Sequence, residues 1–257
     1  MSKIRRLLWS LIPNNNFLYT VTKRYVDRYN GENNENINRN GELRIQTYYL
    51  PDCVTVFDVG ANVGDWTTLS LKVNPDLQIH CFEPSSATFE KLTKCNFGES
   101  VKLNNMGLSS TPGELTLHTF SDGSGENSLY IRKGMEDGWG LEPQSNSETV
   151  RMDTLDEYCL RNEISSIDFM KVDVEGHELE VFKGAVKMVQ NGAIKRIQFE
   201  YGGCNIDSRV LLKDLFDFFS PYGYKFYKIY PKELKYYKRY DQRLENFQYQ
   251  NWIVVSP

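Results

Sequence analysis

Short apolar runs alternate with amphipathic stretches from Cys53 onward. An apolar run of four to eight residues is typical of a buried strand, and apolar residues every three or four positions are typical of a packed helix. Because the two patterns alternate, the sequence predicts βαβ units on a mostly parallel sheet. Five parallel strands are predicted at Val54–Val59, Gln78–Phe82, Val101–Asn105, Ile167–Val172 and Ile194–Phe199.

Helices are predicted between and after these strands, at Asp65–Val73, Ala87–Lys94, Thr154–Arg161, Glu178–Val189 and Val210–Phe219. Two aromatic strands are then predicted at about Tyr224–Tyr230 and Tyr249–Val255. The polar connection between them favours an antiparallel pair. The pattern therefore predicts an α/β Rossmann-like fold with a mostly parallel seven-stranded sheet and an antiparallel last strand.

The alternation is interrupted after the third predicted strand. Residues Gly113–Phe120 alternate apolar and polar positions, which predicts an extra hairpin strand. A stretch rich in Gly, Ser and Glu follows at Ser121–Ser147, and it is long for a simple connection. Its polar donors and Trp139 suit a cover over a sugar, while a surface insertion without function fits the same composition.

The first 50 residues differ from the rest and are predicted to be an N-terminal extension to one domain at residues 51–257. Residues 1–13 combine Lys3, Arg5 and Arg6 with apolar residues near helical spacing. Such a segment either packs on the domain or makes a peripheral membrane contact. The polar stretch Asn30–Asn40 is predicted to be a loop or linker.

Composition and charge narrow the function classes. The chain has 257 residues, of which 40% are hydrophobic, and this is enough for a large core. Its net charge of −4 makes nucleic acid an unlikely partner, and no run of 18 apolar residues is present to span a membrane. The basic, tyrosine-rich segment Pro221–Arg243 could bind RNA, but a solvated strand face is the simpler interpretation. The five scattered cysteines favour a reducing, cytoplasmic setting over disulfides or zinc.

A glycine turn follows the first predicted strand, in the segment VFDVGANVGDWT at Val56–Thr67. Gly60 allows the backbone to turn sharply and approach a ligand, and Gly64 allows close packing of the next helix. The spacing matches neither G-x-G-x-x-G nor a phosphate-binding loop, which makes a diphosphate ligand less favoured. Glu83 ends the second strand 23 residues after Gly60, where a carboxylate can accept both hydroxyls of a ribose. The pair predicts a nucleoside site, although a surface Glu capping the next helix is the alternative.

A second polar group follows the fourth strand, in KVDVEGHE at residues 171–178. Parallel strands present their carboxyl ends at one edge, where ligands bind in such sheets. Asp173, Glu175 and His177 are therefore expected near the ligand. Helix capping is the alternative explanation for these acids and is sufficient for Glu178.

The segments VFDVGANVGDWT, FEP, RMDTLDEY and KVDVEGHELEVFKGA together resemble the FkbM family of S-adenosylmethionine (SAM)-dependent methyltransferases over about Thr55–Phe199. The resemblance implies that the glycine turn and the acid after the second strand hold SAM, with the third-strand exit, Asn104–Gly107, near the adenine. The implied cofactor residues are Asp58, Gly60, Asn62, Gly64, Glu83 and Asn105. It also implies methyl transfer to oxygen, commonly a hydroxyl of a sugar or another secondary metabolite, and a sugar or glycan hydroxyl is the acceptor we expect.

Methyl transfer to a hydroxyl needs two partners held in line and a group that accepts a proton. The candidates are Asp173, Glu175, His177 and Glu200, with Asp173 favoured by position and His177 by its ordinary pKa. Asp173, Glu175 and Glu200 could also hold a divalent metal such as Mg²⁺, which the spacing alone does not establish. A lipid or small natural product as acceptor, an RNA methyltransferase and a non-catalytic nucleoside-binding scaffold remain alternatives. The oligomeric state is not predicted.

Overall fold

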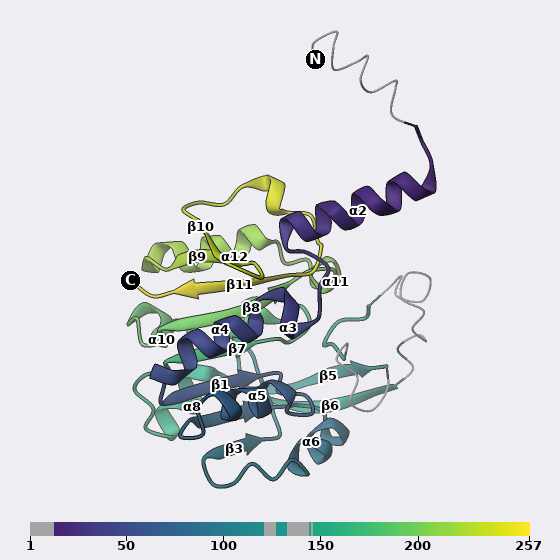
Figure 1. Cartoon of the computed structure of the whole chain (residues 1–257). Coiled ribbons are helices and arrows are strands. Elements are labelled where there is room, and N and C mark those ends of the chain that lie inside the picture. Colours follow the sequence, from purple (N-terminus) through teal and green to yellow (C-terminus); the bar gives the residue numbers. More distant parts are fainter. Residues whose placement is uncertain (1–12, 121–126, 133–143, 145) are drawn as a thin grey trace.

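An eight-stranded sheet forms the centre of the protein in a computed structural model, which describes residues 13–120, 127–132, 144 and 146–257 (Figure 1). From edge to edge the strands are β10 (Leu234–Tyr237), β9 (Lys225–Ile229), β11 (Gln250–Val255), β8 (Arg196–Tyr201), β7 (Phe169–Val172), β1 (Thr55–Val59), β2 (Gln78–Phe82) and β3 (Val101–Asn104). The five strands from β8 to β3 are parallel, and β11 lies antiparallel between β8 and β9. The predicted α/β fold, mostly parallel with an antiparallel last strand, is confirmed.

The predicted count of seven strands is wrong, because β10 adds an eighth at the sheet edge. It pairs antiparallel with β9, with Leu234 opposite Ile229 and Tyr237 opposite Phe226. β10 is four residues long and none of its residues is buried. An edge strand with so little burial has no apolar run by which to recognise it.

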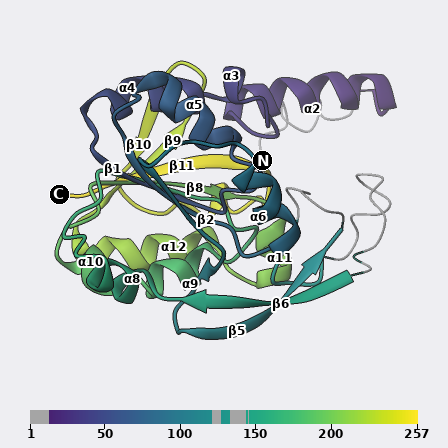
Figure 2. The same ribbon diagram turned by 90° about the horizontal axis from the view of Figure 1, so that it is seen from below.

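Helices cover both faces of the main sheet (Figure 2). One face packs against α4 (Glu42–Tyr49), α5 (Asp65–Val73) and α6 (Ser86–Thr93), and the other against α8 (Leu155–Arg161), α9 (Glu178–Lys183), α10 (Val186–Gln190) and α12 (Leu212–Phe219). The remaining short elements are α11 (Cys204–Ser208) and the 3₁₀ turns η1 (Leu50–Asp52), η2 (Ser220–Tyr222) and η3 (Gln242–Leu244).

The single helix predicted at Glu178–Val189 is two helices, α9 and α10. The chain passes the backbone of Ser109 at Gly184, where a Cβ would lie 2.0 Å from the Ser109 carbonyl oxygen. The Asp156 carboxylate accepts hydrogen bonds from the backbone N–H groups of Lys187 and Met188 at the start of α10. This contact from α8 caps a new helix, and the local sequence does not reveal it.

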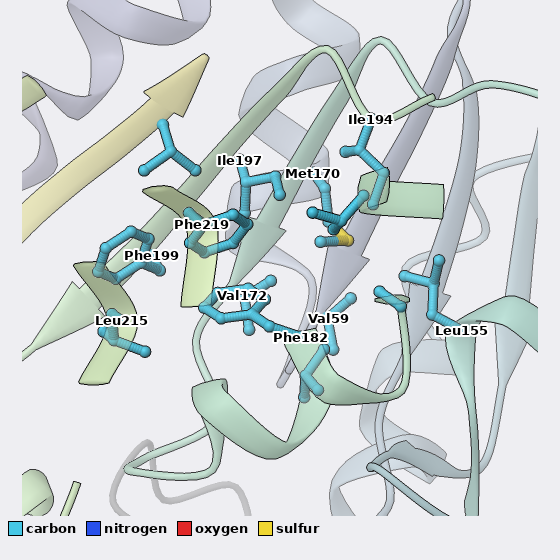
Figure 3. Close-up of a cluster of buried hydrophobic side chains, with 14 of the residues drawn as sticks. Val59, Leu155, Met170, Val172, Phe182, Ile194, Ile197, Phe199, Leu215 and Phe219 are labelled. Atoms are coloured by element: carbon cyan, nitrogen blue, oxygen red, sulfur yellow. The ribbon is translucent and has the colours of Figure 1, made fainter. Parts of the chain in front are cut away.

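The larger core cluster lies under α8, α9 and α12 (Figure 3). There Val59, Val172 and Phe199 of the strands meet Phe182 and Phe219 of the helices, all almost completely buried. Burying a side chain of this size contributes roughly 1.5–3 kcal/mol. Because Val59 and Val172 are the last residues of β1 and β7, this packing fixes where the following residues leave the sheet.

A smaller sheet of three strands lies beside the main one. It contains β4 (Gly107–Leu108), β6 (Asn146–Asp153) and β5 (Gly113–Thr119), and β5 and β6 are antiparallel over seven residue pairs. Leu117, Val150 and Met152 form its small apolar cluster. The hairpin strand predicted at Gly113–Phe120 is confirmed. Trp139 and most of the predicted cover lie outside the described residues.

Helices α2 (Asn16–Asn30) and α3 (Ile37–Asn40) precede α4. α2 extends away from the rest of the molecule and has no buried residue (Figure 1). α3 occupies part of the stretch that was predicted to be a loop, whereas Ile45 of α4 and the adjoining Leu50 lie in the second core cluster. Residues 1–12, which include nearly all of the predicted docking segment, lie outside the described part. In the part described, no helix is both long and apolar enough to cross a membrane.

Candidate functional site

A pocket lies at the carboxyl ends of β1, β2 and β7. β1 pairs with β2 on one side and β7 on the other, so the residues that follow these strands converge. The pocket brings together Gly60, Asn62 and Glu83 with Asp173, Glu175 and His177. The apolar walls come from Leu108 of β4, Leu117 of β5, Met152 of β6 and Leu129 in the segment between β5 and β6.

The turn after β1 can be made only by glycine at position 60. Gly60 has φ +83°, and a Cβ there would lie 1.8 Å from the backbone oxygen of Asp173. The backbone N–H groups of Gly60 and Ala61 both donate to the Phe82 carbonyl at 2.9 Å. The turn is therefore held against β2 on one side and the chain leaving β7 on the other.

Glu83 lies at the base of the pocket with only 7% of its surface exposed. Its carboxylate accepts hydrogen bonds from the backbone N–H of Asn62 at 3.0 Å and of Ser85 at 2.9 Å. Burial raises the pKa of Glu83 to about 7, although these two N–H groups favour the charged form. The carboxylate is thus fixed in orientation and titrates near neutrality.

Two pocket-lining side chains have buried oxygens with no hydrogen-bond partner among the described residues, Asn62 Oδ1 and Thr88 Oγ1. Buried polar atoms normally have partners, so these oxygens fit a polar ligand in the pocket. The carboxylate of Glu83 beside them fits the two hydroxyls of a ribose. Together with the close backbone approach at Gly60, this donor and acceptor set fits the nucleoside part of SAM.

Three other residues implied as cofactor ligands do not line the pocket. Asp58 is fully buried and accepts a 2.7 Å hydrogen bond from the Thr67 hydroxyl. A Cβ on Gly64 would meet Leu92 and Phe97 at 2.8 Å, so this glycine permits helix packing. Asn105 donates to the carbonyls of Glu83 and Pro84 and thereby holds the Glu83 turn. These residues support the pocket from behind.

Asp173 is the first residue after β7, and its carboxylate forms an ion pair with Lys171 at 2.9 Å. Burial disfavours the charge on Lys171, but the negative charges of Asp173, Asp58, Glu200 and Glu42 outweigh this and raise its pKa. Asp173 retains 25% of its side-chain surface exposed and lines the pocket. Asp173 is therefore a carboxylate that is paired with a buried cation and accessible to a ligand.

Glu175 and His177 line the same pocket but are more constrained. Glu175 has φ +52° and is paired with Arg132 at 2.6 Å. The two ring nitrogens of His177 contact the Ser109 hydroxyl at 2.9 Å and the Tyr130 hydroxyl at 3.0 Å. Burial lowers the pKa of His177 to about 4, so its ring is neutral near pH 7.

Glu200 belongs to an acid cluster, defined as Glu42, Asp58, Asp173 and Glu200 around Lys171. Glu42 of α4 accepts hydrogen bonds from Gln198 at 2.8 Å and Asn251 at 3.4 Å, and Glu200 accepts one from Tyr249 at 2.8 Å. Burial raises the pKa of both Glu42 and Glu200. The cluster meets the pocket at Asp173.

The three acids suggested as Mg²⁺ ligands have different partners: Asp173 has Lys171, Glu175 has Arg132 and Glu200 has Tyr249. Within the described ranges, no group of three His, Cys, Asp or Glu side chains could hold a metal ion. The arrangement gives the Mg²⁺ alternative no support.

Several site residues were not expected from the sequence. Tyr130 and Arg132 come from the segment predicted to be a cover, and no periodicity marks them. Glu42 comes from the predicted extension. Lys171 begins the KVDVEGHE segment, and its side chain is buried. A lysine within an otherwise apolar strand was the one sign in the sequence of a buried positive charge near Asp173.

The strand order, the glycine turn after β1 and the acid after β2 define a class I methyltransferase fold. Comparison of the sequence with protein families matches the Methyltransferase FkbM domain over residues 58–226. The chain belongs to this family and is a SAM-dependent methyltransferase, which confirms the predicted family, enzyme class and methyl donor.

Characterised relatives were found at low identity. Methyltransferase sdnD of Sordaria araneosa is 31% identical over 64% of this chain and 74% of its own length. Hexuronic acid methyltransferase AglP of Haloferax volcanii is 30% identical over 53% of this chain and 52% of its own length. 2-O-methyltransferase NoeI of Sinorhizobium fredii is 28% identical over 52% of this chain and 58% of its own length. The chain thus aligns with little more than half of the last two.

Among solved structures, the plantazolicin methyltransferase BpumL in complex with SAH is similar, with a TM-score of 0.45 and 7% identity over 95% of this chain and 92% of that one.

Proposed function

We propose that the protein transfers the methyl group of SAM to a hydroxyl oxygen of a sugar or glycan. The observation that carries the proposal is the pocket in which the Glu83 carboxylate and the Asp173 carboxylate lie at one sheet edge. Two relatives support the acceptor class, because one is named for a hexuronic acid and one for a 2-O position.

In this proposal Glu83 accepts hydrogen bonds from the ribose hydroxyls, and Gly60 and Asn62 provide the close backbone wall of the donor site. Asp58, Gly64 and Asn105 keep this wall in place. When bound, SAM supplies a methyl group made electrophilic by its sulfonium. Apolar walls from Leu117 and Met152 exclude water from the pocket.

Asp173 is the proposed catalytic base or orienting group for the acceptor hydroxyl. Its carboxylate is paired with Lys171 and partly exposed, so its oxygens can accept a proton or a hydrogen bond from a hydroxyl. His177 and Glu175 are assigned positioning roles, since Ser109, Tyr130 and Arg132 already engage their polar atoms. The assignment places the acceptor between Asp173 and the donor.

The experiment that tests the proposal is calorimetric titration with SAM and S-adenosylhomocysteine (SAH), with NAD as the control ligand. Selective binding of SAM and SAH supports the donor site, and a folded protein that binds neither overturns it. Purified protein with SAM is then incubated with a panel of oligosaccharides, lipids and small phenols, and mass spectrometry detects a gain of one methyl group. Methylation confined to lipids or phenols would refute the sugar assignment while leaving the donor site intact. Asp173→Asn should abolish transfer and leave SAH affinity unchanged.

A further inference from the structure

A second groove, separate from the donor pocket, lies between α2, the chain from Gly31 to Asn40 and the turn that joins β9 to β10. Its volume is about 1020 Å³. Ligand pockets generally measure roughly 300–1,000 Å³, so this groove is large enough for more than one sugar ring. It has no role in holding SAM as proposed above.

The groove carries a local excess of positive charge. Arg24 and Arg28 of α2, Arg39 of α3 and Lys232 of the β9–β10 turn all line it, and all are exposed. In the described part of the chain, none of these four side chains forms a hydrogen bond or an ion pair. Two of the acids that line the groove are already paired with other lysines. Asp27 pairs with Lys23 at 3.1 Å and Glu32 pairs with Lys228 at 2.8 Å. Only Glu233 is left among the lining acids to oppose the four cations.

This excess occurs in a protein whose net charge is −4, so it is a local feature. Arginine guanidinium groups bind carboxylates and phosphates through paired, charge-assisted hydrogen bonds. Three arginines from two helices facing one groove therefore point to an anionic ligand. The floor is firmly built, because Arg44 donates to the carbonyls of Tyr230 and Glu233 at 3.0 and 2.9 Å.

The β9–β10 turn that lines the groove lies at the same sheet edge as the donor pocket. β9 is antiparallel to β11, which is antiparallel to β8, so β9 ends at the edge where β7 ends. Three strand spacings separate β9 from β7, which is about 14 Å. A largely buried set of hydrogen-bonded side chains links Asn40 in the groove through Glu42 and Asn251 to Tyr249, just before β11.

We infer that the groove binds the anionic part of the acceptor, an oligosaccharide bearing carboxylate or phosphate groups, while its reacting hydroxyl lies at Asp173. This inference rests on the proposed function. Because strands β9 and β7 lie about 14 Å apart, we assign the anionic group and the methylated hydroxyl to different sugar units. A single monosaccharide is therefore a poor acceptor, and the arginines select among longer chains by charge.

The test compares Arg28→Gln/Arg39→Gln with a matched double variant, Arg151→Gln/Arg239→Gln, which removes two exposed arginines outside the groove. The probes are a galacturonic acid tetrasaccharide, a neutral galactose tetrasaccharide and inorganic pyrophosphate, each titrated calorimetrically into the SAH-saturated protein. We expect the charged tetrasaccharide to bind at least about tenfold more tightly than the neutral one. The groove variant should lose that preference and the control variant should keep it.

SAH affinity measured in the same samples separates the two proposals. If SAH does not bind, the proposed function fails, whatever the groove binds. If SAH binds equally to all three proteins but charged and neutral tetrasaccharides bind alike, or the groove variant keeps the preference, the groove assignment is overturned. Pyrophosphate binding that is lost only in the groove variant supports the anion site. Vesicles of phosphatidylserine provide a further arm, and arginine-dependent binding of vesicles without binding of the tetrasaccharide also overturns the acceptor assignment.

Discussion

The carboxyl edge of the sheet has two halves that are built in different ways. At β1 and β2 the contacts join residues near in sequence, since Asn62 bonds Glu83 over 21 positions. At β7, β8 and β11 they join distant ones, since Glu42 accepts from Gln198 over 156 positions and from Asn251 over 209. We call the first the local-contact half, which contains Gly60, Asn62 and Glu83, and the second the distant-contact half, which contains the acid cluster around Lys171. The first is held mainly by contacts between residues close in sequence, whereas the second requires the whole chain to be folded.

The largest effect is expected from a substitution at Gly60, where the turn of the local-contact half packs against the backbone of Asp173. In Gly60→Ala the new Cβ meets the Asp173 carbonyl at 1.8 Å, and φ is +83°. We expect no measurable SAH binding and a loss of more than about 5 kcal/mol in the free energy of unfolding. Gly98→Ala is the control, because Gly98 has φ +86° but nothing within 4 Å of a Cβ. It should cost only about 1–2 kcal/mol, and equal losses in urea unfolding would contradict the close-approach argument.

The next largest loss of stability is expected from a substitution at Lys171, and it should leave SAH binding in the local-contact half nearly unchanged. Lys171→Met removes the buried cation of the acid cluster and leaves Asp173 unpaired, which should cost about 3–5 kcal/mol in unfolding free energy. Lys195→Met is the control, since its pair with Asp168 is half exposed and worth at most about 1 kcal/mol. Denaturant titration measures both variants. SAH affinity corrected for the folded fraction should stay within about threefold of wild type, and a larger change would show that the two halves are coupled.

A third prediction concerns the pH dependence of the local-contact half. Burial raises the pKa of Glu83 in the folded protein to about 7, above its ordinary value of 4.5, so the folded state holds this proton more tightly. Its contribution to stability is full below about pH 4.5 and is lost as the pH rises through 7, by up to about 3 kcal/mol. Unfolding followed from pH 4.5 to 8 should show this decline in wild type and a shallower one in Glu83→Gln.

Donor affinity should change in the opposite direction, because the ionised carboxylate accepts both ribose hydroxyls. SAH affinity should rise as the pH increases through about 7, and Glu83→Gln should lower it at least about tenfold at pH 8. Glu99→Gln, a change on the surface away from the pocket, serves as the control. If wild type and Glu83→Gln have parallel pH profiles, Glu83 is not the titrating group.

The smallest effect is expected for Tyr130→Phe. This change removes one hydrogen bond to His177 and should cost about 1 kcal/mol of stability. If His177 is a positioning residue, turnover falls by less than about tenfold and the pH profile of transfer is unchanged. A profile that shifts in the variant would instead give His177 a catalytic role.

The sequence was sufficient to bring together Gly60, Asn62 and Glu83 in the local-contact half, but it did not reveal that Asp58, Gly64 and Asn105 lie behind the pocket, nor the contacts of the distant-contact half. Gly60, Asn62 and Glu83 stand in a short segment in which strand, turn and acid occur at fixed spacing, so their convergence was predictable. Glu42 reaches the site only because α4 packs on the sheet beside β8 and β11, which no periodicity within residues 42–49 reveals. Arg132 and Tyr130 meet Glu175 and His177 across more than 40 positions. The strand β10 was missed because an exposed edge strand has no apolar pattern.

The place of β11 in the sheet has a consequence for how the protein is synthesised. β11 lies between β8 and β9, yet β9 and β10 leave the ribosome before it. Until residues 250–255 have been translated, β8 keeps an unpaired edge and the β9–β10 hairpin has no sheet to join. Unpaired strand edges promote association between chains. A nascent chain that stalls before Gln250 is therefore expected to be a substrate for chaperones or proteases, even if its local-contact half has already folded.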